Sequence, residues 1–213
     1  MSEHEKMEVD VLFVGAGPAS LAGAYHLLQL VRRHNEQGGA QKLEPTVAVV
    51  EKGAAPGNLG LSGGVLDPRA IQELMPDWRA RGFPVEAEVA SDEIRILTRR
   101  SAFRLPFNPP AMENHGNVVV SLAAVSAWMA GEVEKAGGNL FSGFAATELL
   151  YDGDRVTGVR TGDKGIAKDG ARRANFEPGI DLAAKVTVLG EGPRGTLAKR
   201  HIARFRLDEG CNP

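Results

Sequence analysis

The chain has 213 residues, enough for one sizeable hydrophobic core, and its 43% apolar and 24% charged residues are ordinary for a soluble globular protein. Its formal net charge of −2 gives no electrostatic indication of nucleic-acid or anionic-membrane binding. The single cysteine, Cys211, excludes an internal disulfide and a complete iron–sulfur ligand set within the chain, and the five histidines lack metal-ligand spacing.

The N-terminal residues 1–8 are polar and rich in acidic side chains, unlike a signal or transit peptide. The apolar run 9–31 is long enough to resemble a membrane span, but it contains Asp10 and His26 and changes its periodicity at two glycines. We therefore expect a strand, a turn and a helix here rather than a transmembrane segment, and this part of the sequence favours a cytoplasmic location.

A βαβ unit is predicted near the N-terminus. Apart from Asp10, Val9–Val14 consists of β-branched and large apolar residues, typical of a parallel strand that is buried on both faces. Pro18 suits the first turn of a helix that ends near His34. A polar loop, Gln37–Pro45, leads to a second buried strand, Thr46–Val50. The two strands should be parallel and joined by a right-handed crossover.

The turn between the first strand and the helix reads GAGPAS, a relaxed form of the G-x-G-x-x-G/A fingerprint that receives a pyrophosphate. Gly15 would allow the tight turn, Gly17 would allow close approach of a phosphate, and free N–H groups at the helix N-terminus would bind it. Pro18 and Ala19 complete this turn. Ser20 takes the third small position, where we expect it to be tolerated at a cost of roughly 1 kcal/mol, with its hydroxyl bonded back to the helix backbone.

Glu51 follows the second strand, where an acidic side chain can accept both ribose hydroxyls of an adenosine and would repel a 2′-phosphate. FAD or NAD is therefore expected rather than NADP, with Lys52 as a neighbouring cofactor contact. FAD is favoured because no regular run of βαβ units follows. The alternative interpretation is a turn and a surface carboxylate that bind no nucleotide.

Residues 53–120 begin with a glycine-rich loop, Gly53–Gly64, and continue into a short amphipathic helix that starts at Asp67 and Pro68. The apolar side chains of this helix have the spacing i, i+3, i+4 and i+7; they are Ile71, Leu74, Met75 and Trp78. Strands are expected around residues 94–97, 103–105 and 117–120.

Ser121 is expected to cap a helix over 122–136, which Gly137 and Gly138 would end. A strand over 139–142 and a hairpin that turns at residues 152–154 follow. A buried strand over 185–189 leads into GEGPRG, and residues 196–204 are expected to be helical.

Beyond these general patterns, three stretches resemble the electron transfer flavoprotein-ubiquinone oxidoreductase family: LSGGVLDPRAIQELMPDW, NHGNVVVSL, and the segment from GFAATELLYDGDR to AAKVTVLGEG. The pair GIAKDG and NFEPGIDLAAK is the most specific part of the resemblance, because neither is a general nucleotide motif. VTVLGEGPRG also resembles the second motif of FAD-dependent hydroxylases, usually Asp-Gly, with Glu191 in place of the aspartate. The resemblance extends from Asp10 to Pro213.

The resemblance implies an FAD/NAD(P)-binding Rossmann-like α/β fold of the glutathione-reductase or hydroxylase type, with a parallel sheet and an inserted β-rich region. It implies an oxidoreductase that passes electrons from reduced electron transfer flavoprotein to ubiquinone, using FAD and one [4Fe-4S] cluster and no catalytic side chain. The implied FAD contacts are Gly15, Gly17 and Glu51 at the adenosine and pyrophosphate, Ser62, Gly63 and Gly64 near the flavin, and Glu191 with Gly192 near the pyrophosphate or ribityl chain.

Members of this family are longer than this sequence, and their cluster cysteines lie beyond its C-terminal end. Residues 1–213 are therefore expected to form the N-terminal part of one FAD-binding domain, incomplete at the C-terminus and inactive by itself. Its parts would be the βαβ unit at 9–52, the loop, helix and β insertion at 53–120, and the helix, hairpin, strand and Glu-Gly motif at 121–213.

In the family, the region of the amphipathic helix dips into the bilayer, so the stripe Ile71, Leu74, Met75 and Trp78 would contact a membrane surface or, alternatively, pack in a core. Membrane contact implies a peripheral enzyme on the cytoplasmic side of a bacterial membrane or on the inner mitochondrial membrane. Two other functions stay open: a related FAD-dependent reductase or hydroxylase, and a catalytically silent nucleotide-binding remnant.

Overall fold

The computed structural model describes residues 4–38, 41–167 and 169–211, so residues 39–40 of the predicted polar loop and Lys168 of GIAKDG lie outside the described part. The chain divides into two compact units. The first unit comprises Met1–Leu59 and Ser126–Pro213, and the second comprises Gly60–Val125.

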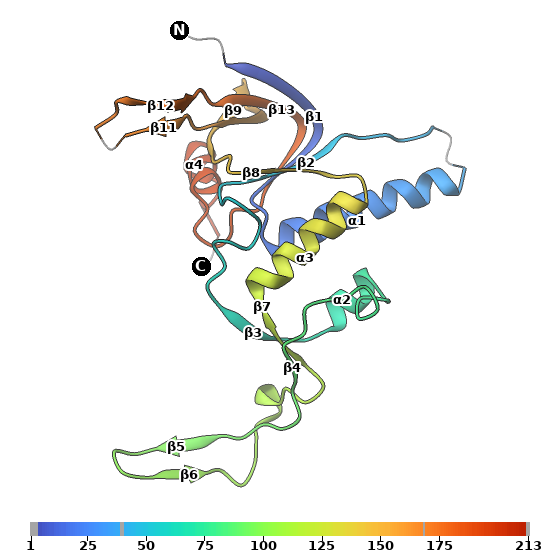
Figure 1. Cartoon of the computed structure of the whole chain (residues 1–213), viewed down its shortest axis with the longest axis vertical. Coiled ribbons are helices and arrows are strands. Elements are labelled where there is room, and N and C mark those ends of the chain that lie inside the picture. Colours follow the sequence, from blue (N-terminus) through green and yellow to red (C-terminus); the bar gives the residue numbers. More distant parts are fainter. Residues whose placement is uncertain (1–3, 39–40, 168, 212–213) are drawn as a thin grey trace. The chain divides into compact units, whose positions relative to one another are not determined.

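The first unit contains a six-stranded sheet in the order β8-β2-β1-β13-β10-β9, and Figure 1 shows β8, β2, β1 and β13 side by side. These four strands are parallel, whereas β10 and β9 are antiparallel to their neighbours. The strands are β1 (Glu5–Val14), β2 (Val47–Glu51), β8 (Asn139–Ser142), β9 (Ala146–Asp152), β10 (Arg155–Thr161) and β13 (Ile180–Leu189). A two-stranded ribbon is formed by β11 (Lys164–Ile166) and β12 (Arg172–Glu177).

The two predicted N-terminal strands and the helix between them are confirmed. Every residue of β2 is buried, as expected for a central parallel strand covered on both faces. α1 (Pro18–Glu36) has Pro18 in its first turn and buries the apolar stripe Leu21, Tyr25 and Leu28. The first strand begins earlier than the apolar run, at Glu5, because β13 pairs with it along its whole polar extension.

Asp10 is a charged residue within the apolar part of β1, and its carboxylate has two partners. It accepts a hydrogen bond from Lys185 Nζ at 2.6 Å and another from Thr46 N at 2.7 Å. These bonds, the one from Lys185 first, hold the pKa of Asp10 below its usual range. The carboxylate therefore links β1 to β13 and to the residue that precedes β2.

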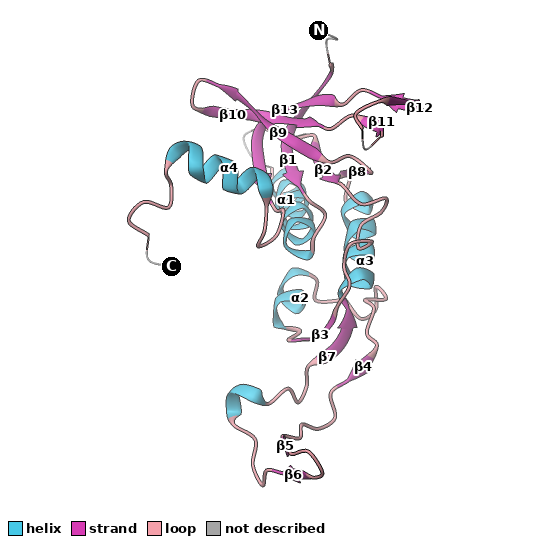
Figure 2. Ribbon diagram, turned by 90° about the vertical axis from the view of Figure 1, so that its left-hand side faces the viewer, coloured by secondary structure: helices cyan, strands magenta, loops and turns pink. Residues whose placement is uncertain are grey.

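The remaining helices of the first unit are α3 (Leu122–Lys135), most of which belongs to this unit, and α4 (Thr196–Phe205). Figure 2 shows α1 and α3 next to the sheet. Ser121 Oγ accepts from Ala124 N at 3.3 Å, which confirms the predicted cap of α3. Helix α4 lies against the edge strand β9, where Arg200 donates to Thr147 O at 2.9 Å. This contact satisfies a carbonyl group of the edge strand.

The second unit is built from two small sheets. One has the order β3-β7-β4 and the other is the hairpin β5-β6. Its elements are β3 (Gly63–Leu66), α2 (Arg69–Leu74), β4 (Ala87–Glu88), β5 (Arg95–Leu97), β6 (Ala102–Arg104), the 3-10 helix η1 (Pro110–Met112) and β7 (Val118–Ser121).

Helix α2 is shorter than the apolar spacing predicts. It ends at Leu74, and Met75 is extended, with φ −143° and ψ 90°. Residue 76 is proline, which disfavours the helical conformation for the residue before it. Met75 and Trp78 therefore lie beyond the helix, in the turns that follow.

The burial of this stripe favours core packing over membrane contact. Ile71, Met75 and Trp78 are 8%, 1% and 2% exposed, and the rings of Trp78 and Phe83 pack edge to face with centroids 5.0 Å apart. The expected membrane contact through these side chains is therefore wrong for these three; Leu74 is half-buried.

Candidate functional site

The fingerprint turn is built around Gly15, directly after β1. Gly15 has φ +97°, a conformation that other residues rarely adopt, and its N–H donates to Val50 O at 2.8 Å. A Cβ at this position would lie 2.6 Å from Gly190 O, at the end of β13. Both the backbone conformation and the close approach of β13 therefore require glycine at the turn.

The N-terminus of α1 is open to an anion. Gly17 is the N-cap residue and provides no side-chain cap, and the first turn contains no acidic residue. A Cβ on Gly17 would meet nothing within 4 Å. Free N–H groups and the positive end of the helix dipole favour a phosphate at this place.

Glu51 joins the end of β2 to this turn. Its side chain is buried, and Oε2 accepts from Ala16 N at 2.9 Å while Oε1 accepts from Gly53 N at 2.6 Å. A carboxylate has about four acceptor sites, so two backbone bonds leave capacity for ribose hydroxyls. The structure therefore places the predicted acid beside the predicted phosphate turn and fixes its orientation.

Ser20 is accommodated by a glycine on the neighbouring strand end. It is 4% exposed and lies against Gly190, where an added Cβ would collide with Ser20 Oγ. The expected bond from this hydroxyl to the helix backbone is wrong, because within the described part of the chain Ser20 Oγ has no hydrogen-bond partner. Space at Gly190, rather than a polar contact, makes the serine tolerable.

Glu191 has a different role from Glu51 in this structure. Its carboxylate accepts from the N–H groups of Thr196, Leu197 and Ala198, at 3.2, 3.2 and 2.9 Å. It thus caps α4, whose own N-cap residue is Gly195. The cofactor contact implied for Glu191 and Gly192 stays a prediction. Because the Glu191 carboxylate is bonded to α4, this contact would have to come from the main chain of the loop.

The remaining predicted contacts are exposed residues. Lys52 is exposed in the first unit. Ser62, Gly63 and Gly64 belong to the second unit, where Gly63 and Gly64 begin β3. A Cβ on Gly63 would lie 2.8 Å from Val120 O, so strand pairing requires this glycine, whereas a Cβ on Gly64 would meet nothing within 4 Å. Their contact with a flavin stays a prediction.

The segment that follows β8 also contacts Glu51, and no sequence pattern predicted this. Gly143 N donates to Gly53 O at 2.8 Å, and Phe144 N donates to Glu51 O at 2.9 Å. Lys164 Nζ lies 3.6 Å from the centroid of the Phe144 ring. The order of strands along the sheet brings these residues to Glu51, and the sequence contains no local pattern for that order.

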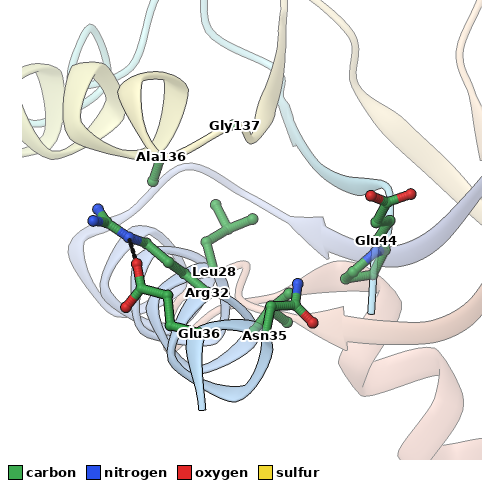
Figure 3. Close-up of a pocket in the computed structure, with 9 residues that line it drawn as sticks. Leu28, Arg32, Asn35, Glu36, Glu44, Ala136 and Gly137 are labelled. Carbon is green, nitrogen blue, oxygen red and sulfur yellow. Dashed lines mark hydrogen bonds and ion pairs between the residues drawn. The ribbon is translucent and has the colours of Figure 1, made fainter. Parts of the chain in front are cut away.

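A cavity of about 490 Å³ lies at the other end of α1, where Leu28, Arg32, Asn35, Glu36, Glu44 and Ala136 are among the residues that line it (Figure 3). Two of these lining residues form an ion pair, in which Arg32 Nε donates to Glu36 Oε1 at 2.7 Å. Helix C-termini carry partial negative charge, which disfavours a phosphate. This cavity is therefore a poor candidate for the dinucleotide.

Within the described ranges, His, Cys, Asp and Glu side chains form no group of three or more that could hold a metal ion. The same residues include no helix that is both long and apolar enough to cross a bilayer.

Comparison with known proteins gives a consistent family of relatives, although no family model matches the chain. The mitochondrial electron transfer flavoprotein-ubiquinone oxidoreductases of Arabidopsis thaliana and Bos taurus are 42% and 43% identical to it, over 98% and 97% of this chain. The probable electron transfer flavoprotein-ubiquinone oxidoreductase of Acinetobacter baylyi is 43% identical over 99% of the chain. The chain spans 31%, 33% and 37% of the length of these three relatives.

Solved structures show the same fold at much lower identity. The anhydrotetracycline hydroxylase OxyS from Streptomyces rimosus aligns with a TM-score of 0.55 and 20% identity, over 92% of this chain and 34% of its own. The FAD-dependent chondrochloren halogenase CndH aligns with a TM-score of 0.53 and 18% identity, over 90% of this chain and 39% of its own. The predicted FAD-binding Rossmann-like α/β fold is thus confirmed.

Proposed function

Because the chain is homologous over nearly its whole length to about a third of the electron transfer flavoprotein-ubiquinone oxidoreductases, we propose that it binds FAD within an enzyme of that activity. Such an enzyme takes electrons from reduced electron transfer flavoprotein and passes them to ubiquinone. In this enzyme the chain would bind the cofactor, and by itself it is expected to show no catalytic turnover.

The observation that best supports FAD binding is the contrast between two helix N-termini. The first turn of α4 is neutralised by the carboxylate of Glu191, whereas α1 has Gly17 as its N-cap residue, no side-chain cap and no acidic residue in its first turn. Glu51 is held beside the open terminus by its bond to Ala16 N. An anionic diphosphate and a ribose are the chemical groups that fit this pair.

In this assignment the turn at Gly15 and Gly17 and the first N–H groups of α1 bind the pyrophosphate, and Glu51 accepts from the adenosine ribose. Lys52, Ser62, Gly63, Gly64, Glu191 and Gly192 remain proposed contacts along the rest of the cofactor. When bound, FAD would supply the electron-transfer chemistry through its flavin ring, and the protein would set its position, burial and potential.

The cluster and the quinone site are proposed for the enzyme as a whole. One cysteine cannot supply the four thiolate ligands of a [4Fe-4S] cluster, so the cluster ligands would have to come from outside this sequence.

A membrane contact is proposed for the second unit, at residues other than the buried stripe. Hairpin β5-β6 and the segment after it expose large apolar side chains; Ile96, Leu97, Phe103, Phe107 and Met112 are 54 to 75% exposed. Clustered exposed apolar side chains are typical of surfaces that meet a partner or a lipid interface. An enzyme that delivers electrons to ubiquinone requires such an interface.

Isothermal titration calorimetry of the 213-residue chain with ADP and with FAD tests the proposal. Glu51→Ala should weaken ADP binding roughly 10-fold or more, because hydrogen bonds to a charged group are worth about 1.5–3 kcal/mol. The control Glu44→Ala removes an exposed carboxylate whose partner is Lys42 and should leave binding unchanged. Adenosine 2′,5′-bisphosphate should bind more weakly than ADP. Absence of binding by both ADP and FAD to the folded chain would refute the proposal.

A further inference from the structure

Three neighbouring strand ends define a line along the carboxyl edge of the sheet. β1 ends at the Gly15 turn, β2 ends at Glu51, and β8 ends at Ser142 on the other side of β2. Glu51 is the direct pairing partner of Ser142. The phosphate turn and the end of β8 therefore lie on opposite sides of the acidic residue.

The chemistry of an adenosine diphosphate fixes its direction along this line. The two ribose hydroxyls lie on C2′ and C3′, between C1′, which bears the base, and C4′, which bears the 5′-phosphate arm. If Glu51 binds the hydroxyls and the diphosphate lies at the Gly15 turn, the base must point toward the other side of Glu51. That side is formed by Gly143 and Phe144.

The backbone of this segment is held firmly against β2. Phe144 N donates to Glu51 O and Gly143 N donates to Gly53 O, at 2.9 and 2.8 Å. Gly143 has φ +77°, so the chain turns sharply here and requires glycine. The Phe144 ring therefore extends from a main chain that is directly bonded to the acidic residue.

The Phe144 ring is half-buried and packs edge to face with Phe141, with centroids 6.5 Å apart. Lys164 Nζ from β11 lies over the ring, 3.6 Å from its centroid. The Lys164 side chain is itself 37% exposed, and the carboxylate of its ion-pair partner, Glu177, is 4.0 Å away. A flexible, partly exposed side chain thus covers an aromatic face at the position where a base is expected.

We propose that Phe144 is the base-stacking residue of the nucleotide site. The adenine ring stacks on its aromatic face, in competition with the Lys164 ammonium group that lies over the ring. This inference rests on the proposed function, because it requires the diphosphate and the ribose at Gly15 and Glu51. It adds a specificity-determining residue that selects an aromatic base.

Calorimetry of the full 213-residue chain with ADP compares Phe144→Leu with Phe144→Trp. Leucine keeps apolar volume but loses the aromatic face, so the dissociation constant should rise roughly 5- to 150-fold, the range found when a stacked base loses its aromatic partner. Tryptophan restores the stacking face and should bind ADP within about threefold of the unchanged chain. The matched control Phe205→Leu changes another half-buried phenylalanine, at the end of α4, with Arg204 over its ring, and should leave ADP binding unchanged.

A spectroscopic measurement separates stacking from a loss of structure. In the unchanged chain, the adenine H2 and H8 protons of bound ADP should shift upfield in the ring current of Phe144, and this shift should be absent in Phe144→Leu. Lys164→Met removes the competing cation and should tighten ADP binding roughly two- to fivefold. If ADP binds but Phe144→Leu changes neither its affinity nor these shifts, the inference is overturned while the proposed function stands. If neither ADP nor FAD binds, both fail.

Discussion

Gly190 and Ser20 are in such close contact that their substitutions should be strongly coupled. A Cβ on Gly190 would collide with Ser20 Oγ, and it would also lie 3.2 Å from Ser20 Cβ and 3.4 Å from Val14 O. Gly190 cannot withdraw, because its N–H donates to Val14 O at 2.9 Å at the end of the sheet. Ser20 is buried in the first turn of α1.

The expected cost follows from these distances. Overpacking a close-packed site by one methyl group typically costs about 1–3 kcal/mol, and the collision with Oγ places Gly190→Ala near the upper end, at about 2–3 kcal/mol of unfolding free energy. Ser20→Ala removes the colliding atom and leaves the 3.2 Å approach between the two β carbons. In that background Gly190→Ala should cost about 1 kcal/mol or less, a coupling of about 1–2 kcal/mol.

Ser20→Ala by itself should not destabilise the fold. The hydroxyl is buried and, within the described part of the chain, lacks a hydrogen-bond partner, and such groups cost about 1–3 kcal/mol relative to a satisfied state. Its removal should raise the unfolding free energy by up to about 1 kcal/mol.

Urea unfolding followed by far-ultraviolet circular dichroism measures all four states of this double-mutant cycle. In thermal unfolding, a loss of about 2 kcal/mol should lower Tm by about 4–8 °C for a chain of this size. Gly131→Ala in α3 is the matched control, because a Cβ there meets nothing within 4 Å and alanine favours a helix interior. If Gly190→Ala costs the same in the unchanged chain as it does in the Ser20→Ala background, the reasoning is refuted.

The contacts described above support three further predictions. Glu191→Ala should lower the unfolding free energy by about 1–2 kcal/mol through loss of the α4 cap, and Glu191→Gln should lower it less; equal stability of all three proteins in urea would exclude the cap. In vesicle flotation, the double variant Leu97→Asp/Phe103→Asp should reduce the amount of protein recovered with the membrane. Ile71→Asp should chiefly lower Tm, because that side chain is buried. Unchanged protein recovery for the double variant would exclude the proposed surface. The Asp181 carboxylate accepts two hydrogen bonds from Arg160, at 2.7 and 2.9 Å, which lower its pKa. The stability that it contributes is therefore present above the ordinary aspartate pKa of about 4 and is lost as the pH falls through the lowered value. In urea unfolding, Asp181→Asn should be less stable than the unchanged chain at pH 7 and equally stable in strong acid.

The local patterns of the sequence predicted the strands and helices of the first unit well. Continuous apolar runs identified β1 and β2, and alternation around Asp152–Asp154 identified the hairpin β9 and β10. These elements form where the local pattern and the tertiary environment agree. By contrast, the first two residues of β3, Gly63 and Gly64, were expected to belong to a glycine-rich loop. They are in a strand because β3 pairs with β7, which lies far away in the sequence.

The same distinction applies to the candidate site. Gly15 and Glu51 were predicted correctly as neighbours, because the βαβ connection brings the ends of its two parallel strands together. Phe144 was missed because its proximity to Glu51 depends on β8 joining the sheet beside β2. The close contact between Ser20 and Gly190 was missed because Gly190 lies at the end of a strand that comes much later in the chain.

Glu51 and Glu191 show why a strand-end acid cannot be assigned from its own surroundings in the sequence. Each lies at or just after the end of a strand of the parallel sheet and is followed by a glycine within two residues. A helix begins soon after Glu191, and its free N–H groups need acceptors, so the carboxylate turns toward α4. No helix follows Glu51 directly in the first unit, so its carboxylate bonds to Ala16 N of the neighbouring turn instead. The element that comes next in the chain therefore decides which acid caps a helix and which remains available to a ribose.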